Sequence, residues 1–273
     1  MLKTDCPTSW SKPHWRILCY HAISDGFTDG FRAQLVAFRE MGFTFIDFDS
    51  GLNLCRGEGF TKPMMTVTFD DGHRTIHTNA LPILEELGIK GFLYLIADNV
   101  NKSRTHRDEN SLQVVTLSNV RDWIRMGHGL GSHTLTHAPL HLCSDSRLMQ
   151  ECTLSKHILE DIFQVPIRHL SYPFGQHSTR TYEFLRRGSS YDSAATTDRG
   201  KMSRGHDLFR LRRDVCDPKM SVESIVRVMQ LADRWYWLRH FRRYWRRHFS
   251  QRRRNWEKRH PEEKWEAIPE LSK

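Results

Sequence analysis

A serial alternation of short β-rich runs and amphipathic helical stretches is the feature that most constrains the fold of this chain of 273 residues. Strand–helix units in series favour a parallel sheet covered by helices. We therefore predict an α/β fold, a distorted (β/α) barrel of about seven parallel strands. The pattern alone does not show whether the sheet closes on itself.

Hydrophobic period and punctuation locate the individual elements. The predicted strands cover residues 16–23, 43–48, 64–69, 91–96, 130–133, 192–197 and 208–215, and residues 169–175 read as a strand that runs into a Pro/Gly turn. Helical spacing predicts helices over 31–42, 79–88, 117–127, 145–163, 179–188 and 221–233, and residues 97–111 read as a long loop. We expect Ser118 or Asn119 to cap the helix at 117–127.

The positive charge of the chain is concentrated in one segment. The formal net charge is +9, but eleven of the 41 Lys and Arg residues and only one of the 32 Asp and Glu residues lie between Arg234 and His260. The rest of the chain is close to neutral, so the charge does not mark the whole protein as a nucleic-acid binder. We predict a folded domain over 1–230, a basic amphipathic helix over 231–260 and a flexible tail over 261–273.

Cysteine usage and the N-terminal residues bear on the compartment. The six cysteines are scattered without a C-x-x-C pair, and we expect reduced thiols because a chain of this size does not need disulfides. Residues 1–18 lack the apolar run of a signal peptide. No stretch approaches the ~20 apolar residues of a spanning helix. We expect a cytoplasmic protein, unless the sequence begins after a removed signal.

Two short motifs carry candidate chemistry. "VTFDDGHRT" places Asp70 and Asp71 side by side at the end of a predicted strand, and "SHTLTH" places His133 and His137 four residues apart. On a helical turn, that spacing would bring both imidazoles to one metal ion. Two histidines and one carboxylate are a usual ligand set for catalytic zinc. Together the motifs predict a metal site with Asp71, His133 and His137 as ligands and Asp70 as the base.

Each motif alone has an ordinary explanation. A D-D-G sequence is usually a turn or a helix cap. One H-x-x-x-H pair arises easily in a chain with 16 histidines. Only the combination indicates a catalytic site.

The motifs "TFDDG", "SHTLTH" and "YPFG", in that order and preceded by "YHAI", resemble the polysaccharide deacetylase family, the NodB-like carbohydrate esterases. The resemblance covers residues 17–214. It implies that residues 1–230 are the catalytic domain of a metal-dependent hydrolase, which removes an N-acetyl group from an amino sugar in a polysaccharide or a lipid-linked glycan. Zn²⁺ is the expected metal, and Co²⁺, Ni²⁺ or Mn²⁺ would suit the same ligands.

The resemblance also implies roles for matching positions. Asp70 would be the general base, and Asp71, His133 and His137 would bind the metal. In "SYPFG", Tyr172, Pro173 and Phe174 would line the substrate groove, where a backbone N–H would stabilise the oxyanion. Without the other motifs, "YPFG" would be an ordinary β-turn.

Two positions depart from the family pattern. Ser171 stands where many members carry an arginine that orients the base, and the late leucine-x-histidine motif, whose histidine is the general acid, is not visible. His21 is our substitute candidate for the acid; the alternative is a packed strand residue. These departures keep open a catalytically inactive glycan-binding relative as a second hypothesis. An N-formyl or O-acetyl substrate also stays open, because the same site could hydrolyse either.

The segment "RWYWLRHFRRYWRRHFSQRRRNW" at 234–256 is the second informative feature. As a helix it would gather most aromatic side chains on one arc and most arginines opposite. It could lie peripherally on an anionic membrane, pack on the folded domain, or bind an anionic polymer such as nucleic acid. We favour the membrane and do not expect nucleic acid. A lipid-linked sugar at the cytoplasmic membrane face would then be an attractive substrate.

Overall fold

The computed structural model describes residues 10–100 and 114–233 of the chain. The chain divides into two compact units, Met1–Met229 and Gln230–Lys273, and the fold described below is that of the first. The predicted basic segment at 234–256, the tail from 261 and most of the predicted loop at 97–111 lie outside the described residues. Among the helices of the described ranges, none is both long enough and apolar enough to span a bilayer.

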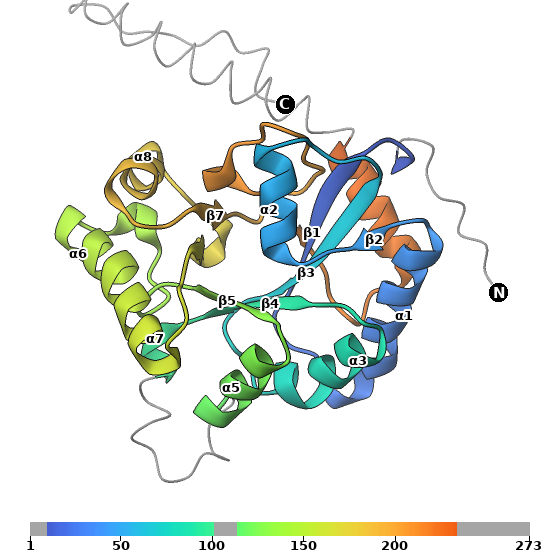
Figure 1. The fold of residues 1–273 in the computed structure, drawn as a ribbon, viewed down its shortest axis with the longest axis horizontal. Helices are drawn as coiled ribbons and strands as arrows, with labels where there is room; N and C mark the ends of the chain where they lie inside the picture. Colours follow the sequence, from blue (N-terminus) through green and yellow to red (C-terminus); the bar gives the residue numbers. More distant parts are fainter. Residues whose placement is uncertain (1–9, 101–113, 234–273) are drawn as a thin grey trace, which may run out of the picture. The chain divides into compact units, whose positions relative to one another are not determined.

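A parallel sheet organises this unit (Figure 1). The strands run in the order β7-β6-β5-β4-β3-β1-β8, and β2 pairs with β3 beside this path. Their bounds are β1 (His14–Tyr20), β2 (Thr44–Phe45), β3 (Pro63–Phe69), β4 (Gly91–Leu95), β5 (Gly129–Ser132), β6 (His169–Ser171), β7 (Ser193–Ala195) and β8 (Asp214–Val215). The predicted distorted barrel of parallel strands is confirmed. Within the described residues its two end strands, β7 and β8, do not pair with each other, so the barrel stays open there.

Helices connect consecutive strands and lie around the sheet (Figure 1). They are α1 (Thr28–Glu40), α2 (Phe48–Arg56), α3 (Leu81–Glu86), α5 (Leu117–Arg125), α6 (Asp145–Met149), α7 (Ser155–Phe163) and α8 (Thr179–Gly188), and residues 222–233 are helical as well. Two single π-helical turns, Ile76–Ala80 and Gln150–Leu154, precede α3 and α7. The long helix predicted at 145–163 is therefore α6 and α7 joined through a π turn.

Three local predictions were wrong, each for a local physical reason. The strand predicted at 43–48 is only β2, because the Asp47 side chain accepts a hydrogen bond from the N–H of Ser50 and starts α2 there. The cap of α5 is Thr116, which exchanges side-chain hydrogen bonds with Asn119 in a capping box. The strand predicted at 208–215 is a 3₁₀ turn followed by the two residues of β8.

Both faces of the central strands are buried, as expected for a parallel sheet covered by helices. Along β1, Trp15 and Ile17 pack in one apolar cluster with Phe92, whereas Leu18 and Tyr20 pack in the other. This alternation follows from the two-residue period of a strand. The cysteines within the described residues are free thiols, and most of them are buried in this core.

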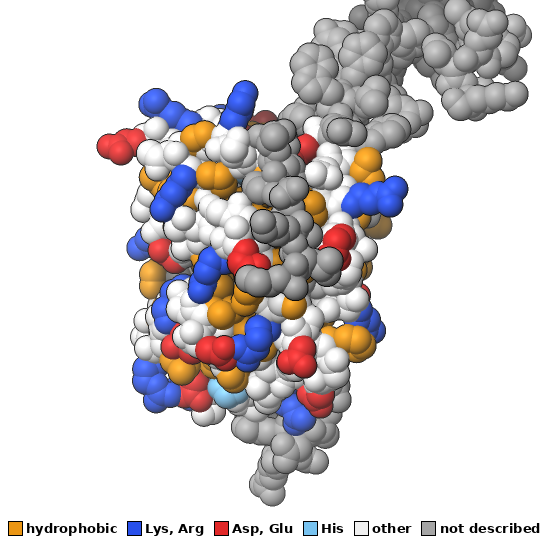
Figure 2. All heavy atoms as spheres, turned by 90° about the vertical axis from the view of Figure 1, so that its right-hand side faces the viewer, with side chains coloured by type: hydrophobic (Ala, Val, Ile, Leu, Met, Phe, Trp, Pro, Cys, Tyr) orange, Lys and Arg blue, Asp and Glu red, His pale blue; other side chains and the backbone are white. Residues whose placement is uncertain are grey.

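The surface carries charges of both signs. On the face shown in Figure 2, Lys and Arg side chains are interspersed with Asp and Glu. This mixed pattern agrees with the near-neutral composition of the chain outside 234–260.

The strand register brings the candidate residues to one edge of the sheet. The last residue of β1 pairs with the last residue of β3, and the last residue of β4 pairs with the last residue of β5. The residues that follow these strands, including His21, Asp70 and His133, therefore meet at the carboxyl edge. This is the edge at which β/α barrels place their reactive groups.

Candidate active site

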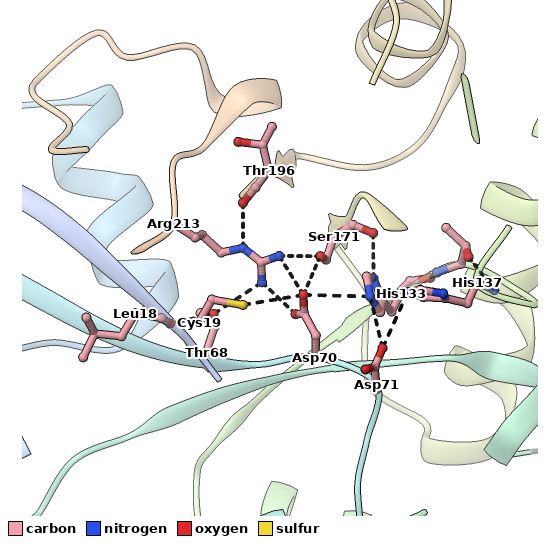
Figure 3. A network of polar contacts seen from close by, with 12 residues as sticks. Leu18, Cys19, Thr68, Asp70, Asp71, His133, His137, Ser171, Thr196 and Arg213 are labelled. Carbon is pink, nitrogen blue, oxygen red and sulfur yellow. Dashed lines mark hydrogen bonds and ion pairs between the residues drawn. The ribbon is translucent and has the colours of Figure 1, made fainter. Parts of the chain in front are cut away.

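Asp71, His133 and His137 face one another at the carboxyl edge (Figure 3). The Asp71 Oδ1 atom lies 3.4 Å from Nε2 of His133 and 3.6 Å from Nε2 of His137. Nδ1 of His133 lies 2.9 Å from the carbonyl oxygen of Ser171. Because a carbonyl oxygen only accepts, Nδ1 of His133 carries the proton and its Nε2 presents a lone pair to the site.

The two histidines converge through a loop, not through the helical turn that their spacing predicted. They lie in the irregular segment that follows β5, where Thr134 and His137 both have positive φ angles of 69° and 63°. Left-handed residues reverse the chain sharply, so the two imidazoles meet without a helix. The predicted proximity is therefore observed, although the predicted geometry was wrong.

The residues of this cluster fit a divalent cation. Asp71 Oδ1 is buried and has no hydrogen-bond partner within the described residues. One carboxylate oxygen and two imidazole nitrogens, all within 4.8 Å of one another, are the donor set that tetrahedral zinc prefers. Three such atoms would repel one another without a cation or a proton between them. Although burial lowers it, the charges of Asp70 and Asp71 raise the pKa of His133 above its ordinary value, which reflects this need for positive charge.

Asp70 is buried beside this cluster and is held by Arg213. The guanidinium contacts both carboxylate oxygens, Nη1 to Oδ1 and Nη2 to Oδ2, each at 2.7 Å. Arg213 is also fully buried, and it donates further hydrogen bonds to the Ser171 hydroxyl at 2.8 Å and to the carbonyl of Thr196 at 2.9 Å. Burial raises the pKa of the Asp70 carboxyl, but the charges of Arg213 and then His133 outweigh it and hold that pKa well below its usual range.

Arg213 is the functional residue that sequence reasoning missed. Where the family pattern has an arginine next to the aromatic–proline pair, this chain has Ser171, yet a guanidinium reaches Asp70 from the residue before β8. Ser171 keeps a part in the same network, because its hydroxyl donates to Asp70 at 3.2 Å. The signal available in the sequence was weak: an arginine in the apolar context of a predicted strand, 143 residues from its partner.

His21 lies at the end of β1, where the sequence placed it. It is exposed, and one of its ring nitrogens lies within 4.8 Å of ligand atoms of both Cys19 and Asp70. Its charge contributes to lowering the pKa of Asp70 and of Asp71. An exposed imidazole at the rim of the site is not the packed strand residue that was the alternative.

The "YPFG" turn presents only one of its three predicted substrate-binding side chains. The Tyr172 ring is fully buried, and its hydroxyl donates to the carbonyl of Phe209 at 3.1 Å, so this ring belongs to the core. Pro173 is buried as well. Phe174, by contrast, is 58% exposed, and its ring centroid lies 4.6 Å from that of His137.

Fold and donor set together define a class: a β/α-barrel protein with a donor set suited to a divalent cation beside a buried carboxylate. The comparison with known families narrows this class. Residues 57–188 match the family model described as polysaccharide deacetylase. The resemblance to the polysaccharide deacetylases that the motifs predicted is confirmed over this stretch of the chain. His21 and Arg213 lie outside the matched residues.

Individual proteins are similar to this chain in sequence or in fold. YxkH of Bacillus subtilis (strain 168), whose name assigns it provisionally to the polysaccharide deacetylases, is 25% identical over 229 residues, or 80% of this chain and 78% of YxkH. The fold is similar to that of the Streptococcus pyogenes deacetylase PplD in complex with acetate, with a TM-score of 0.69, 24% identity, and coverage of 80% of this chain and 99% of PplD. IcaB from Ammonifex degensii has a TM-score of 0.66 at 22% identity, with 81% and 98% covered.

Proposed function

We propose that this protein is a metal-dependent hydrolase that removes the N-acetyl group of an amino sugar in a polysaccharide or a lipid-linked glycan. The observation that carries the proposal is the convergence of Asp71, His133 and His137 on one point beside the buried carboxylate of Asp70. The match of residues 57–188 to the polysaccharide deacetylase model supports the reaction class. Zinc is the default metal for this ligand set, and Co²⁺, Ni²⁺ or Mn²⁺ are the alternatives.

Asp70 is the general base in this proposal. When bound, a divalent cation polarises the acetyl carbonyl and lowers the pKa of a water molecule towards ~7. Asp70 takes the proton from the water that attacks the acetyl carbon. The pairing with Arg213 keeps Asp70 ionised and fixes the direction of its oxygens.

The turn after β6 offers a donor to the oxyanion. The N–H groups of Tyr172, Gly175 and Gln176 already donate to carbonyls of the protein. The Phe174 N–H is therefore our candidate, and the positive φ of 58° at this residue sets its direction. A backbone donor aimed at developing charge is a strong source of catalysis.

The leaving group needs a proton for the carbon–nitrogen bond to break. His21 at the rim is our candidate general acid. Cleavage releases acetate and the free amino group of the sugar. A water molecule supplies the oxygen of the acetate and the proton that the amine finally carries.

Metal content tests this proposal without a guess about the substrate. We would measure bound transition metal per chain in the parent, in His137→Ala, and in His157→Ala, a control at an exposed histidine of α7. About one equivalent in the parent and the control, and little in His137→Ala, is the expected result. An absence of metal in the parent, even after incubation with zinc, would move the protein to the glycan-binding hypothesis.

Turnover tests the roles of the residues. Acetylated and formylated amino sugars would be screened with the loaded protein. Asp70→Asn should keep the metal and lose turnover by ~10²–10⁴-fold. A near-normal rate in this variant would exclude Asp70 as the base.

We further propose that the basic segment at 234–256 attaches the protein to an anionic membrane on its cytoplasmic face. The support is its sequence pattern of interleaved arginine and tryptophan. The test is co-sedimentation with vesicles containing anionic lipid, comparing the full chain with a chain ending at Asp233. Equal sedimentation of the two would exclude the segment as the anchor.

A further inference from the structure

Glu151 is a fully buried carboxylate that the proposed chemistry does not use. It is 0% exposed and lies in the π-helical turn Gln150–Leu154 between α6 and α7. A buried glutamate is rare unless its charge is paired and its oxygens accept hydrogen bonds. Its partners therefore indicate what it does.

Nearly every partner of this carboxylate belongs to the segment between His133 and His137. Oε2 accepts from the N–H of Leu135 at 3.0 Å and from the N–H of Thr136 at 2.9 Å. Oε1 accepts from the hydroxyl of Thr136 at 2.6 Å. The carbonyl oxygen of Glu151 also accepts from the N–H of Leu135 at 3.0 Å. We call residues 133–137 the histidine loop.

The charge of Glu151 is balanced by Arg147, one turn earlier. A guanidinium nitrogen of Arg147 lies 2.6 Å from Oε1 of Glu151 and donates to the hydroxyl of Thr136 at 3.0 Å. The arginine therefore joins the same network instead of drawing Glu151 away from the loop. Four donors converge on the two carboxylate oxygens, and an ionised glutamate has enough lone pairs to accept all four hydrogen bonds.

The histidine loop needs such an anchor, because its backbone is not one that its residues prefer. Thr134 and His137 have positive φ, a region that costs a non-glycine residue roughly 1–2 kcal/mol. Glu151 holds the two residues that lie between them. Glu151 lies within a single π turn, and such turns occur often at functional sites.

We propose that Glu151 is a positioning residue for the metal site: its carboxylate fixes the backbone of the histidine loop so that the imidazoles of His133 and His137 face Asp71. This inference rests on the proposed function, since it assumes that these imidazoles bind a metal. It assigns an effect on metal affinity to a side chain that is not itself a ligand. Loss of an outer residue that orients ligands typically weakens metal binding by about 10–100-fold.

The first test is Glu151→Gln, which keeps the shape but replaces one acceptor oxygen by an NH₂ group facing N–H donors. Glu160→Gln is the matched control. Glu160 lies on α7, also accepts a backbone N–H, that of Ile167 at 2.9 Å, and also pairs with a base, Lys156. Within the described residues, the hydrogen bonds of the Glu160 carboxylate go to Lys156 and Ile167 and not to the histidine loop. Zinc and cobalt affinities would be measured by chelator competition, together with the Tm of each metal-free protein.

We expect Glu151→Gln to bind zinc about 10–100-fold more weakly than the parent and to change the visible spectrum of bound cobalt, which reports ligand geometry. Glu160→Gln should bind as the parent does, even where its Tm falls. A folded Glu151→Gln protein with a zinc Kd within about twofold of the parent would overturn the inference.

A second variant covers the case in which Glu151→Gln does not fold. Thr136→Val removes one hydroxyl donor to Glu151 and leaves both ligands in place. We expect the zinc Kd to rise at least about threefold, and an unchanged Kd would overturn the inference. If the parent itself binds no metal, the proposed function fails with it. If the parent binds metal and the variants bind it equally well, only the role of Glu151 is refuted.

Discussion

Removal of Arg213 is the most direct test of how this site is built. Arg213→Met leaves the volume nearly filled but strips the buried Asp70 of two hydrogen bonds at 2.7 Å. Both side chains are at most 3% exposed, so water cannot replace the lost partner. Breaking a buried pair from one side typically costs about 3–5 kcal/mol. We expect a loss of that size in the free energy of unfolding at pH 7.

The same variant should invert the pH dependence of the contribution that Asp70 makes to the free energy of unfolding. In the parent, the pKa of Asp70 lies below its unfolded value, so its contribution is present above pH ~4 and is lost as the pH falls through the folded pKa. Without Arg213, burial dominates and raises the pKa of Asp70 above its unfolded value. The variant should then lose less stability than the parent on going from pH 7 to pH 4.

Urea unfolding at several pH values measures both effects. Arg16→Met is the control, because Arg16 forms another fully buried ion pair, with Asp214 at 2.7 Å. It should cost stability without changing the contribution of Asp70 to the pH dependence. The reasoning is refuted if Arg213→Met loses less than about 1 kcal/mol, or if its pH dependence matches that of the parent.

Three further predictions follow from single positions. Burial lowers the pKa of His128 from 6.5 to about 4. The contribution of this histidine to stability is therefore full above pH 6.5 and is lost as the pH falls towards 4. In urea titrations, His128→Asn should flatten this decline, which is on the order of 2 kcal/mol. Gly175 has φ +64°, and an added Cβ would lie 1.9 Å from the hydroxyl of Thr197, so Gly175→Ala should lose roughly 2–4 kcal/mol of stability. Gly26→Ala is the control: an added Cβ there would have no atom within 4 Å, and stability should change by less than about 0.5 kcal/mol. Phe174 is 58% exposed, so Phe174→Ala should leave Tm unchanged and raise KM about tenfold; an unchanged KM would remove it from the substrate groove.

The structure bears on the two departures that favoured an inactive relative. The arginine expected next to the aromatic–proline pair is absent, but Arg213, the residue before β8, pairs with Asp70 instead. His21 is exposed, and one of its ring nitrogens lies within 4.8 Å of a carboxylate oxygen of Asp70. Both observations strengthen the hypothesis of an enzyme over that of a glycan-binding protein.

Features that depend on neighbouring residues could be predicted from the sequence. Buried strands such as β3, helices such as α1, and the order of strand–helix units follow from hydrophobic period, which is a local property. The motifs with Asp70 and His133 lie at strand ends, so the parallel topology brings them to one edge. That much of the site was present in the order of the amino acids.

Other features were decided only by tertiary structure. The pairing of Asp70 with Arg213 joins residues 143 positions apart, and no local pattern distinguishes Arg213 from its neighbour Arg212. The buried hydroxyl of Tyr172 is satisfied by the carbonyl of Phe209, which is distant in the sequence. The left-handed backbone at His137 contradicts local preference, and contacts such as those of Glu151 hold its loop in that conformation. Local sequence determines which segments become strands and helices, because that choice depends on near neighbours. The charge and direction of each site residue depend on distant partners, because burial makes every unpaired charge costly and only the folded chain supplies the pairs.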